Sequence, residues 1–217
     1  MKLKTLKSYD KKVASLKQEI SKLKVSKLRN IENRKKRLHS SRYICITGHY
    51  NAGKTTLFNK ITGLNKEISN KPFTTLSSKY GKYKKGKDLF FIDSIGFVLD
   101  LDPLLIKSFE LNLLDMLNAD KMLYVIDISE EKSLLFHKTR YGLDLLKKIG
   151  INVIEKVVII FNKIDKLKDS NSDEYIKGLV EEFPYPFKIL PYLNLSAEKG
   201  INIDDLIYYL LNTVIDT

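Results

Sequence analysis

The hydrophobic pattern of the chain changes near residue 41. From residue 42 onward, short apolar runs alternate with longer segments whose apolar residues recur every three or four positions. The runs predict buried strands, and the longer segments predict amphipathic helices. The predicted strands are 43–47, 76–83, 88–93, 121–128, 157–162 and 188–195, and the predicted helices are 54–63, 103–118, 131–149, 172–183 and 202–215.

This alternation is typical of an α/β domain in which helices cover both faces of a mostly parallel sheet. Only the turn at 84–87 is too short for a crossover, so the strands at 76–83 and 88–93 should pair in antiparallel fashion. The other connections are long enough for the right-handed crossovers that join parallel strands. We therefore expect a six-stranded sheet with one antiparallel strand, and functional residues at the carboxyl ends of its strands.

Residues 1–40 form a separate basic segment. No Gly or Pro occurs between residues 2 and 38, and an apolar stripe with three-four spacing slips by about one position near residues 25–30. This pattern predicts one long helix, or a helical hairpin bent at that point. The segment holds 14 Lys and Arg residues against three acids, a net of +11 out of +12 for the whole chain. We therefore divide the chain into a basic helical arm, 1–40, and an α/β domain, 41–217.

Three interpretations of the arm stay open. Its lysines surround a stripe that packs against the α/β domain, or they contact RNA phosphates such as those of the ribosome, or the stripe joins two copies of the chain through residues 6–31. A membrane-surface helix is less favoured, because Tyr9 is the only aromatic residue of the stripe. Charge alone does not choose among the three.

Composition excludes several classes of protein. A single cysteine, Cys45, excludes a disulfide framework and fits a reducing compartment. No apolar stretch approaches the length of a membrane span, and the first residues lead into no signal-peptide core. We expect a soluble, cytoplasmic protein.

A phosphate-binding motif follows the first predicted strand. Residues 48–55 have the pattern G-x-x-x-x-G-K-T, between an apolar run and the start of a helical pattern. Glycines let the backbone approach phosphates, and the N–H groups at the start of the helix point toward them. Lys54 would reach the β- and γ-phosphates, and the Thr55 hydroxyl would ligate Mg²⁺. The predicted nucleotide contacts in this loop are His49, Tyr50, Asn51, Ala52, Gly53, Lys54, Thr55 and Thr56.

Two further segments would complete a site for the γ-phosphate and Mg²⁺. A D-x-x-G motif follows the third strand, where the Asp93 carboxylate can hold Mg²⁺ through water and the Gly96 N–H can meet the γ-phosphate. The connection before the second strand contains Thr74 and Thr75, either of which can ligate the metal. We expect the segments that hold these residues to respond to the phosphate state, namely 65–80 and 94–104.

An N-K-x-D motif after the fifth strand predicts selection of guanine. The Asp165 carboxylate can accept hydrogen bonds from the guanine N1–H and 2-amino groups, which adenine lacks on that edge. Asn162 would fix the loop, and the aliphatic stem of Lys163 would lie over the base. Ser196 and Ala197, after the sixth strand, would support the same pocket, with the Ala197 N–H facing the base oxygen.

In this order and spacing, the five motifs resemble the GTPase superfamily of P-loop proteins, which implies a Ras-like fold, GTP or GDP as ligand and Mg²⁺ as cofactor. Within it, the chain resembles the HflX family of ribosome-associated GTPases, on segments 48–59, 73–76, 93–98, 105–109 and 119–127. The resemblance implies that Thr75 is the metal-binding threonine and that Lys54, Thr75 and Gly96 serve catalysis. Members of the family usually carry a further N-terminal domain, which we expect this chain to lack.

Hydrolysis of GTP needs a water molecule placed in line with the γ-phosphate, and Phe97 stands where many small GTPases carry a water-orienting Gln. Either another group orients the water, or turnover is slow until a partner completes the site. Asn51 offers one remedy, because potassium-activated GTPases that look similar here use an Asn at this position to help bind K⁺; a loop hydrogen bond is the competing interpretation. We therefore expect a switching GTPase with slow turnover, and the alternative is a nucleotide-gated binding module with negligible catalysis.

Overall fold

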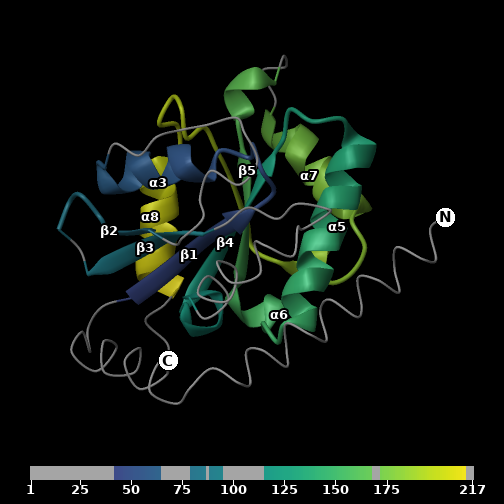
Figure 1. Cartoon of the computed structure of the whole chain (residues 1–217). Helices are drawn as coiled ribbons and strands as arrows, with labels where there is room; N and C mark the ends of the chain where they lie inside the picture. Colours follow the sequence, from purple (N-terminus) through teal and green to yellow (C-terminus); the bar gives the residue numbers. More distant parts are fainter. Residues whose placement is uncertain (1–41, 65–78, 87, 95–114, 168–171, 214–217) are drawn as a thin grey trace.

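Six strands form one mixed sheet in the part of the chain that the computed structural model describes, which comprises residues 42–64, 79–86, 88–94, 115–167 and 172–213. The strand order is β2-β3-β1-β4-β5-β6 (Figure 1). β2 pairs with β3 in antiparallel fashion, and the other neighbouring pairs are parallel. The strands are β1 Arg42–Gly48, β2 Lys79–Lys82, β3 Leu89–Asp93, β4 Lys121–Asp127, β5 Val157–Asn162 and β6 Tyr192–Leu195. The predicted α/β P-loop fold, with one antiparallel pair, is confirmed.

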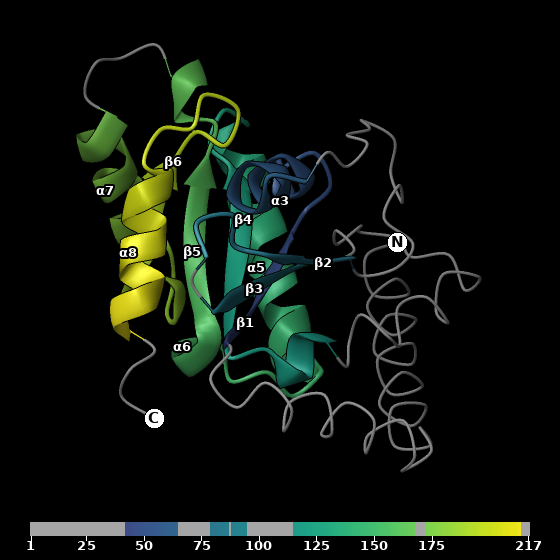
Figure 2. The ribbon, with the colours of Figure 1, turned by 90° about the vertical axis from the view of Figure 1, so that its left-hand side faces the viewer.

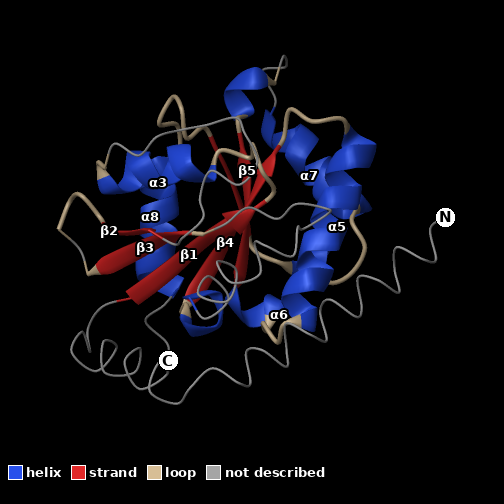
Figure 3. Cartoon of the chain, in the orientation of Figure 1, coloured by secondary structure: helices blue, strands red, loops and turns tan. Residues whose placement is uncertain are grey.

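Helices cover both faces of the sheet, α3 and α8 on one face and α5 and α7 on the other (Figures 1 and 3). Figure 2 shows that α7 and α8 lie toward the β6 edge, far from β2 at the opposite edge. Among the residues that the structure describes, none of the helices combines the length and the apolar character that a membrane span needs. The helices are α3 Lys54–Thr62, α5 Lys132–Lys148, α6 Val153–Lys156, α7 Ser172–Glu182 and α8 Ile203–Thr213, with short 3₁₀ turns η2 at Ile164–Lys166 and η3 at Phe187–Ile189.

The alternation of side chains along the central strands divides the core into two parts. Ile44 and Ile46 of β1 and Leu123 of β4 pack with residues of α3 and α8. Cys45, between the two isoleucines, and Tyr124, next to Leu123, pack with residues of α5 and α7. Because both faces of these strands are buried, their sequences are continuous apolar runs without polar positions in alternation.

The predicted start of the sixth strand was wrong by four residues. Residues 188 and 189 belong to η3, which is closed by hydrogen bonds from Ile189 N to Pro186 O and from Leu190 N to Phe187 O. Pro191 has no N–H to donate to a neighbouring strand, so β6 begins at Tyr192. The apolar character of Ile189 and Leu190 therefore marks a turn and not an extended strand.

The other predicted boundaries agree with the structure to within a few residues, and β5 agrees at both ends. Sequence patterns missed α6, η2 and η3, because a single turn is too short to show a helical period. The predicted arm at 1–40, the start of the strand at 76–83, most of the helix at 103–118 and the last residues of the helix at 202–215 lie outside the described residues. Residues 115–118, at the end of the predicted helix 103–118, are helical.

Candidate nucleotide-binding site

The described residues of the predicted motifs meet at one edge of the sheet. β1 pairs with β4, and β4 pairs with β5, all in parallel, so the carboxyl ends of these three strands lie side by side. The phosphate loop at 48–53 leaves β1 and enters α3 at Lys54. The N-K-x-D segment leaves β5. The pairing of strands thus brings together loops that are 110 residues apart in the chain, as the bond between Asn162 and Ala52 shows.

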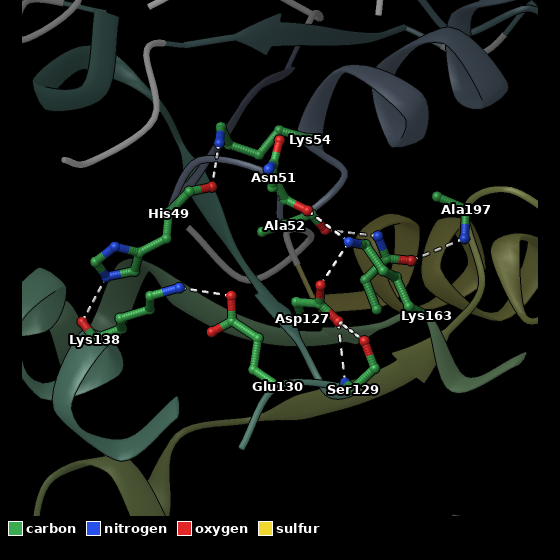
Figure 4. Close-up of polar contacts among 11 residues, drawn as sticks. His49, Asn51, Ala52, Lys54, Asp127, Ser129, Glu130, Lys138, Lys163 and Ala197 are labelled. Carbon is green, nitrogen blue, oxygen red and sulfur yellow. Dashed lines mark hydrogen bonds and ion pairs between the residues drawn. The ribbon is translucent and has the colours of Figure 1, made fainter. Parts of the chain in front are cut away.

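Asn162 joins the phosphate loop to the loop after β6. Its buried side chain donates from Nδ2 to Ala52 O at 2.8 Å and accepts at Oδ1 from Ala197 N at 2.9 Å (Figure 4). Gly53 makes the approach possible, because a Cβ atom at this position would lie 2.3 Å from Nδ2 of Asn162. Gly53 also has a φ of 91°, in the left-handed region that favours glycine. The second glycine of the motif is therefore required by packing and by backbone conformation alike.

Lys163 connects the phosphate loop to the end of β4. Its Nζ donates to Asn51 O at 2.7 Å and to the Asp127 carboxylate at 2.5 Å (Figure 4). The other carboxylate oxygen of Asp127 accepts from Ser129 N at 3.0 Å and from Ser129 Oγ at 2.6 Å. Burial alone would raise the pKa of Asp127, but the hydrogen bonds from Lys163 and Ser129 outweigh it and hold the pKa below its ordinary value. Asp127 therefore stays ionised and fixes the direction of the lysine.

The predicted guanine-facing groups take different positions. Asp165 lies in η2 with its side chain exposed at the edge of the site, where it can reach a ligand. Ser196 is buried, and its Oγ accepts from Lys199 N at 3.1 Å, which closes the loop after β6. The Ala197 N–H donates to Oδ1 of Asn162, and its predicted contact with the base oxygen stays a prediction. The role of this residue in the structure is thus to hold the Asn162 side chain.

Lys54 is buried at the start of α3, and its Nζ donates to the backbone oxygen of His49 at 2.5 Å (Figure 4). Burial lowers the pKa of this lysine to about 8, the Asp93 carboxylate opposes that shift, and the Lys163 ammonium adds to it. A nearby phosphate group would favour the charged form. The lysine is therefore poised to bind an anion that compensates its buried charge.

Two oxygen atoms are suitably placed for Mg²⁺. Thr55 Oγ1 and Asp93 Oδ2 are 3.0 Å apart, where the start of α3 meets the end of β3. Asp93 is fully buried at a position that pairs with Ile46 of β1. Hard oxygen ligands of this kind suit Mg²⁺, which usually takes one or two protein oxygens together with phosphate and water. Within the described ranges, no cluster of three or more His, Cys, Asp or Glu residues suggests a different metal site.

The remaining predicted residues of the loop differ in exposure. Asn51 is exposed and has a φ of 59°, a left-handed conformation that Asn adopts more readily than most residues. Tyr50 is 39% exposed, and His49 is buried. Thr56 is half-buried on the first turn of α3. The predicted metal ligand Thr75, the predicted phosphate contact Gly96 and Phe97 lie outside the described residues.

The sequence patterns missed four residues that the structure brings to the site. Asp127 holds Lys163 and is itself held by Ser129, whereas Lys138 contacts His49 of the phosphate loop and pairs with Glu130. Asp127 lies next to the end of the predicted strand 121–128, and a carboxylate at the carboxyl end of a strand is a usable signal. No local signal distinguishes Lys138 from the other lysines of α5, because its contacts depend on how the helix packs.

Comparison with known proteins agrees with this geometry. The family model described as "50S ribosome-binding GTPase" matches residues 43–163. GTPase HflX of Saccharolobus solfataricus is 31% identical over 216 residues, which are 95% of this chain and 58% of that protein. GTPase HflX of Hyperthermus butylicus is 36% identical over 202 residues, 90% of this chain and 52% of that protein. The chain thus spans about half the length of the curated relatives that it matches.

Solved structures share the fold. A variant of Era from Aquifex aeolicus, bound to GDP·AlF₄⁻, superposes with a TM-score of 0.66 at 24% identity, over 82% of this chain and 58% of that one. NFeoB from S. thermophilus, in a crystal structure with bound GDP·AlF₄⁻ and K⁺, superposes with a TM-score of 0.57 at 29% identity, over 79% of this chain and 62% of that one. Both matches support the fold described above.

Proposed function

Because this chain belongs to the 50S ribosome-binding GTPase family, with HflX proteins as its relatives over about nine-tenths of its length, we propose that it hydrolyses GTP to GDP and phosphate and acts as a slow molecular switch. The observation that carries the proposal is the side chain of Asn162, which joins the phosphate loop to the loop after β6. This contact supports the proposal that one ligand binds to both loops, with its phosphates at the first and its base near the second. A nucleotide is the class of ligand that carries both groups.

Guanine is the base that the loop after β5 favours. The exposed Asp165 carboxylate can accept from the N1–H and 2-amino groups of guanine. The stem of Lys163, fixed by Asn51 O and Asp127, would lie over the base. A base without these donors would leave the carboxylate unmatched, which supports discrimination by several orders of magnitude.

The phosphate end would supply charge and metal. The ammonium of Lys54 would bind the β- and γ-phosphates, and Thr55 with Asp93 would hold Mg²⁺, which neutralises charge on those phosphates. We propose Thr75 as a further metal ligand and Gly96 as a γ-phosphate contact, as the family resemblance implies. The segments 65–80 and 94–104 would then differ between the GTP and GDP states.

We also propose that Asn51 helps to bind K⁺ beside the phosphates. Asn51 is an exposed residue of the phosphate loop, and its backbone oxygen accepts a hydrogen bond from Lys163. Its side chain would therefore lie near the bound phosphates. The NFeoB structure with bound K⁺ supports this role. A cation at this point would add positive charge beside the γ-phosphate, where Phe97 offers no polar group.

Steady-state turnover tests the main proposal. We expect phosphate release with GTP and none above background with ATP, and faster release in K⁺ than in Na⁺ at equal ionic strength. The variant Asp165→Asn should lose GTP and gain xanthosine triphosphate, because xanthine presents a carbonyl where guanine presents its amino group and an amide can donate to it. Equal use of ATP and GTP would contradict the guanine assignment, and equal rates in K⁺ and Na⁺ would contradict the role of Asn51.

Association with the ribosome is a second proposal, favoured by the description of the family and by the basic arm at 1–40. Co-sedimentation with ribosomes, with GDP or a GTP analogue and over a salt series, would measure it. If the arm makes the main contact, deletion of residues 1–40 abolishes binding, and affinity falls steeply with salt. The same deletion also tests whether the arm joins two copies of the chain. A dimer held together through residues 6–31 would become a monomer.

A further inference from the structure

Lys138, in the first half of α5, contacts two consecutive residues of the phosphate loop by different means. Its backbone oxygen lies 2.6 Å from Nε2 of His49 (Figure 4). Its ammonium lies 5.4 Å from the centroid of the Tyr50 ring. The first contact joins positions 89 residues apart in the chain. One residue of a helix therefore touches the loop at both of the positions that follow the first glycine.

The bond to His49 has a defined direction. A carbonyl oxygen only accepts, so Nε2 of the imidazole must carry the hydrogen. The ring is buried, and it meets the Tyr124 ring edge-on at 6.4 Å. In an α-helix the carbonyl of Lys138 also faces the N–H of Gly142, so it serves the helix and the loop together. The loop is thus bonded to the backbone of α5, which moves only with the helix.

The helix is closely packed where this contact occurs. A Cβ atom at Gly142 would lie 1.9 Å from the hydroxyl oxygen of Tyr124 in β4, so only glycine fits at this helical position. The ammonium of Lys138 pairs with Glu130 at 2.6 Å, with the two side chains 10% and 23% exposed. Both charges are therefore largely withdrawn from solvent, and they join α5 to the connection that precedes it. This pairing distinguishes Lys138 from an exposed surface lysine.

His49 transmits the contact toward the phosphates. Its side chain is bonded to α5, and its backbone oxygen accepts from Nζ of Lys54 (Figure 4). The chain of bonds runs from Lys138 through His49 to the lysine that would bind the phosphates. A displacement of α5 would change the position of His49, and with it the backbone that faces the ligand.

We propose that Lys138 and His49 are positioning residues for the nucleotide, through which the position of α5 sets the affinity for guanine nucleotides. The inference rests on the proposed function, because it concerns the same phosphate loop. Lys138 contacts His49 and Tyr50 of the phosphate loop. It would act on the nucleotide only through this loop, without contacting the nucleotide directly.

Seven purified proteins, each with all 217 residues, test the proposal: the unmodified chain, four single variants described here, and Tyr50→Leu alone and combined with Lys138→Met. His49→Phe removes the N–H donor and keeps an aromatic ring, whereas His49→Gln restores a donor. Lys138→Met keeps the backbone carbonyl and removes the ammonium. Arg140→Met is the matched control, two residues away on α5, with a side chain that is 76% exposed. Each variant and the unmodified chain are compared by equilibrium binding of fluorescent GDP and a non-hydrolysable GTP analogue, and by the thermal midpoint without nucleotide.

We expect His49→Phe to weaken binding about five- to tenfold, as loss of one buried hydrogen bond implies. His49→Gln should recover part of that loss. Lys138→Met should weaken binding about two- to threefold, the size of one cation–π contact. Arg140→Met should bind as the unmodified chain does. A double-mutant cycle of Lys138→Met with Tyr50→Leu should give non-additive losses, because the two side chains face each other.

Equal binding by all variants, with tight binding by the unmodified chain, would overturn this inference and leave the proposed function intact. The inference is also overturned if His49→Phe lowers only the thermal midpoint, since the contact would then serve stability alone. Failure of the unmodified chain to bind guanine nucleotides would overturn the proposed function and this inference with it. If His49→Phe does not fold, the cycle of Lys138 with Tyr50 decides the question, because additive losses there would contradict the proposed coupling.

Discussion

At the predicted guanine end of the site, side chains of the loop after β5 are bonded to neighbouring loops and to the end of β4. At the predicted phosphate end, Lys54 is bonded within its own loop and Thr55 is bonded to the end of β3. Asn162 connects Ala52 to Ala197, and Lys163 connects Asn51 to Asp127. By contrast, Lys54 donates to a backbone oxygen of its own loop, and the Thr55 hydroxyl donates to Asp93.

The two ends of the site should therefore differ in how much they contribute to the stability of the fold. Bonds between loops hold the fold together as well as the pocket, so a change at the guanine end should lower stability and affinity together. The groups at the phosphate end are those that phosphate and Mg²⁺ would engage, and the buried ammonium of Lys54 opposes folding when it is charged. A change there should lower activity without loss of stability, as is usual where function requires a strained or charged site.

The largest effect is expected at the phosphate end. Lys54→Met should lower single-turnover GTP hydrolysis by about 10²- to 10³-fold, the size typical of a lost transition-state contact. Its free energy of unfolding in urea should not fall, because burial lowers the pKa of Lys54 to about 8 and so disfavours its charge in the folded state. Lys60→Met, on the same helix α3, is the control and should change neither quantity by much. A Lys54→Met protein that is less stable but hydrolyses GTP normally would contradict the expectation that this end of the site serves activity and not stability.

Next in size is the loss of the Asn162 side chain. Asn162→Ala should lower the free energy of unfolding by about 1–3 kcal/mol, because two buried hydrogen bonds are lost and their partners are left unmatched. Affinity for GDP should fall in parallel, as measured by isothermal titration. Asn152→Ala removes an exposed cap of α6, so it should cost about 1 kcal/mol with unchanged affinity. An Asn162→Ala protein of normal stability would show that the loops are not held by this residue.

A smaller, pH-dependent effect is expected at Asp127. Asp127→Asn should lower the free energy of unfolding at pH 7 by about 1–2 kcal/mol, since its bonds with Lys163 and Ser129 are charge-assisted. The folded-state pKa of Asp127 is below the ordinary value, so its stabilisation is complete above that ordinary value and is lost as pH falls through the folded-state pKa. The gap between the two proteins in urea denaturation should therefore close in acid.

The exposed pair between Lys82 and Asp88 is the control for this measurement, with side chains 48% and 53% exposed. Asp88→Asn should cost less than about 0.5 kcal/mol, as is usual for surface pairs. A cost at Asp88 equal to that at Asp127 would show that the Asp127 pair is not distinguished by its place in the site.

The smallest effect is expected at Cys45, in the middle of β1. Its thiol is fully buried, and burial raises its pKa from 9.0 to about 12. The folded protein should therefore resist a thiol reagent at pH 8 and react only as fast as it unfolds. Because the unfolded thiol ionises at a lower pH than the folded one, the free energy of unfolding should fall as pH rises above about 9. Rapid labelling of the native protein would indicate that the central strand opens locally.

Several features of the fold followed from local patterns. The continuous apolar run at 157–162 predicted β5 at both ends, because burial on both faces leaves no polar positions in the strand. The short turn at 84–87 predicted the antiparallel pair of β2 and β3. The predicted β6 began too early, because the apolar residues 189 and 190 lie in a turn fixed by prolines. Hydrophobic periodicity alone does not distinguish an apolar turn from a short strand.

In the site, too, some features followed from local sequence patterns and others did not. Residues 48–55 and Asn162 were predicted from spacing, since the chemistry of phosphate and base binding needs particular residues close together in the chain. The bond from the N–H of Ala197 to Asn162 was not predicted, because a backbone donor carries no sequence signal of what it faces. The contact between Asp127 and Lys163 was not predicted, because it arises where parallel strands end side by side.

By itself, the sequence determined the order of the elements, the phosphate loop and the motif that favours guanine, because these depend on residue types at short spacing. Only the tertiary structure decided that Lys138 holds His49 and Tyr50 and that Asp127 holds Lys163. The partners in these contacts are between 36 and 89 residues apart. They meet because β1, β4 and β5 pair in one register and α5 packs on Tyr124, and no local pattern encodes that packing.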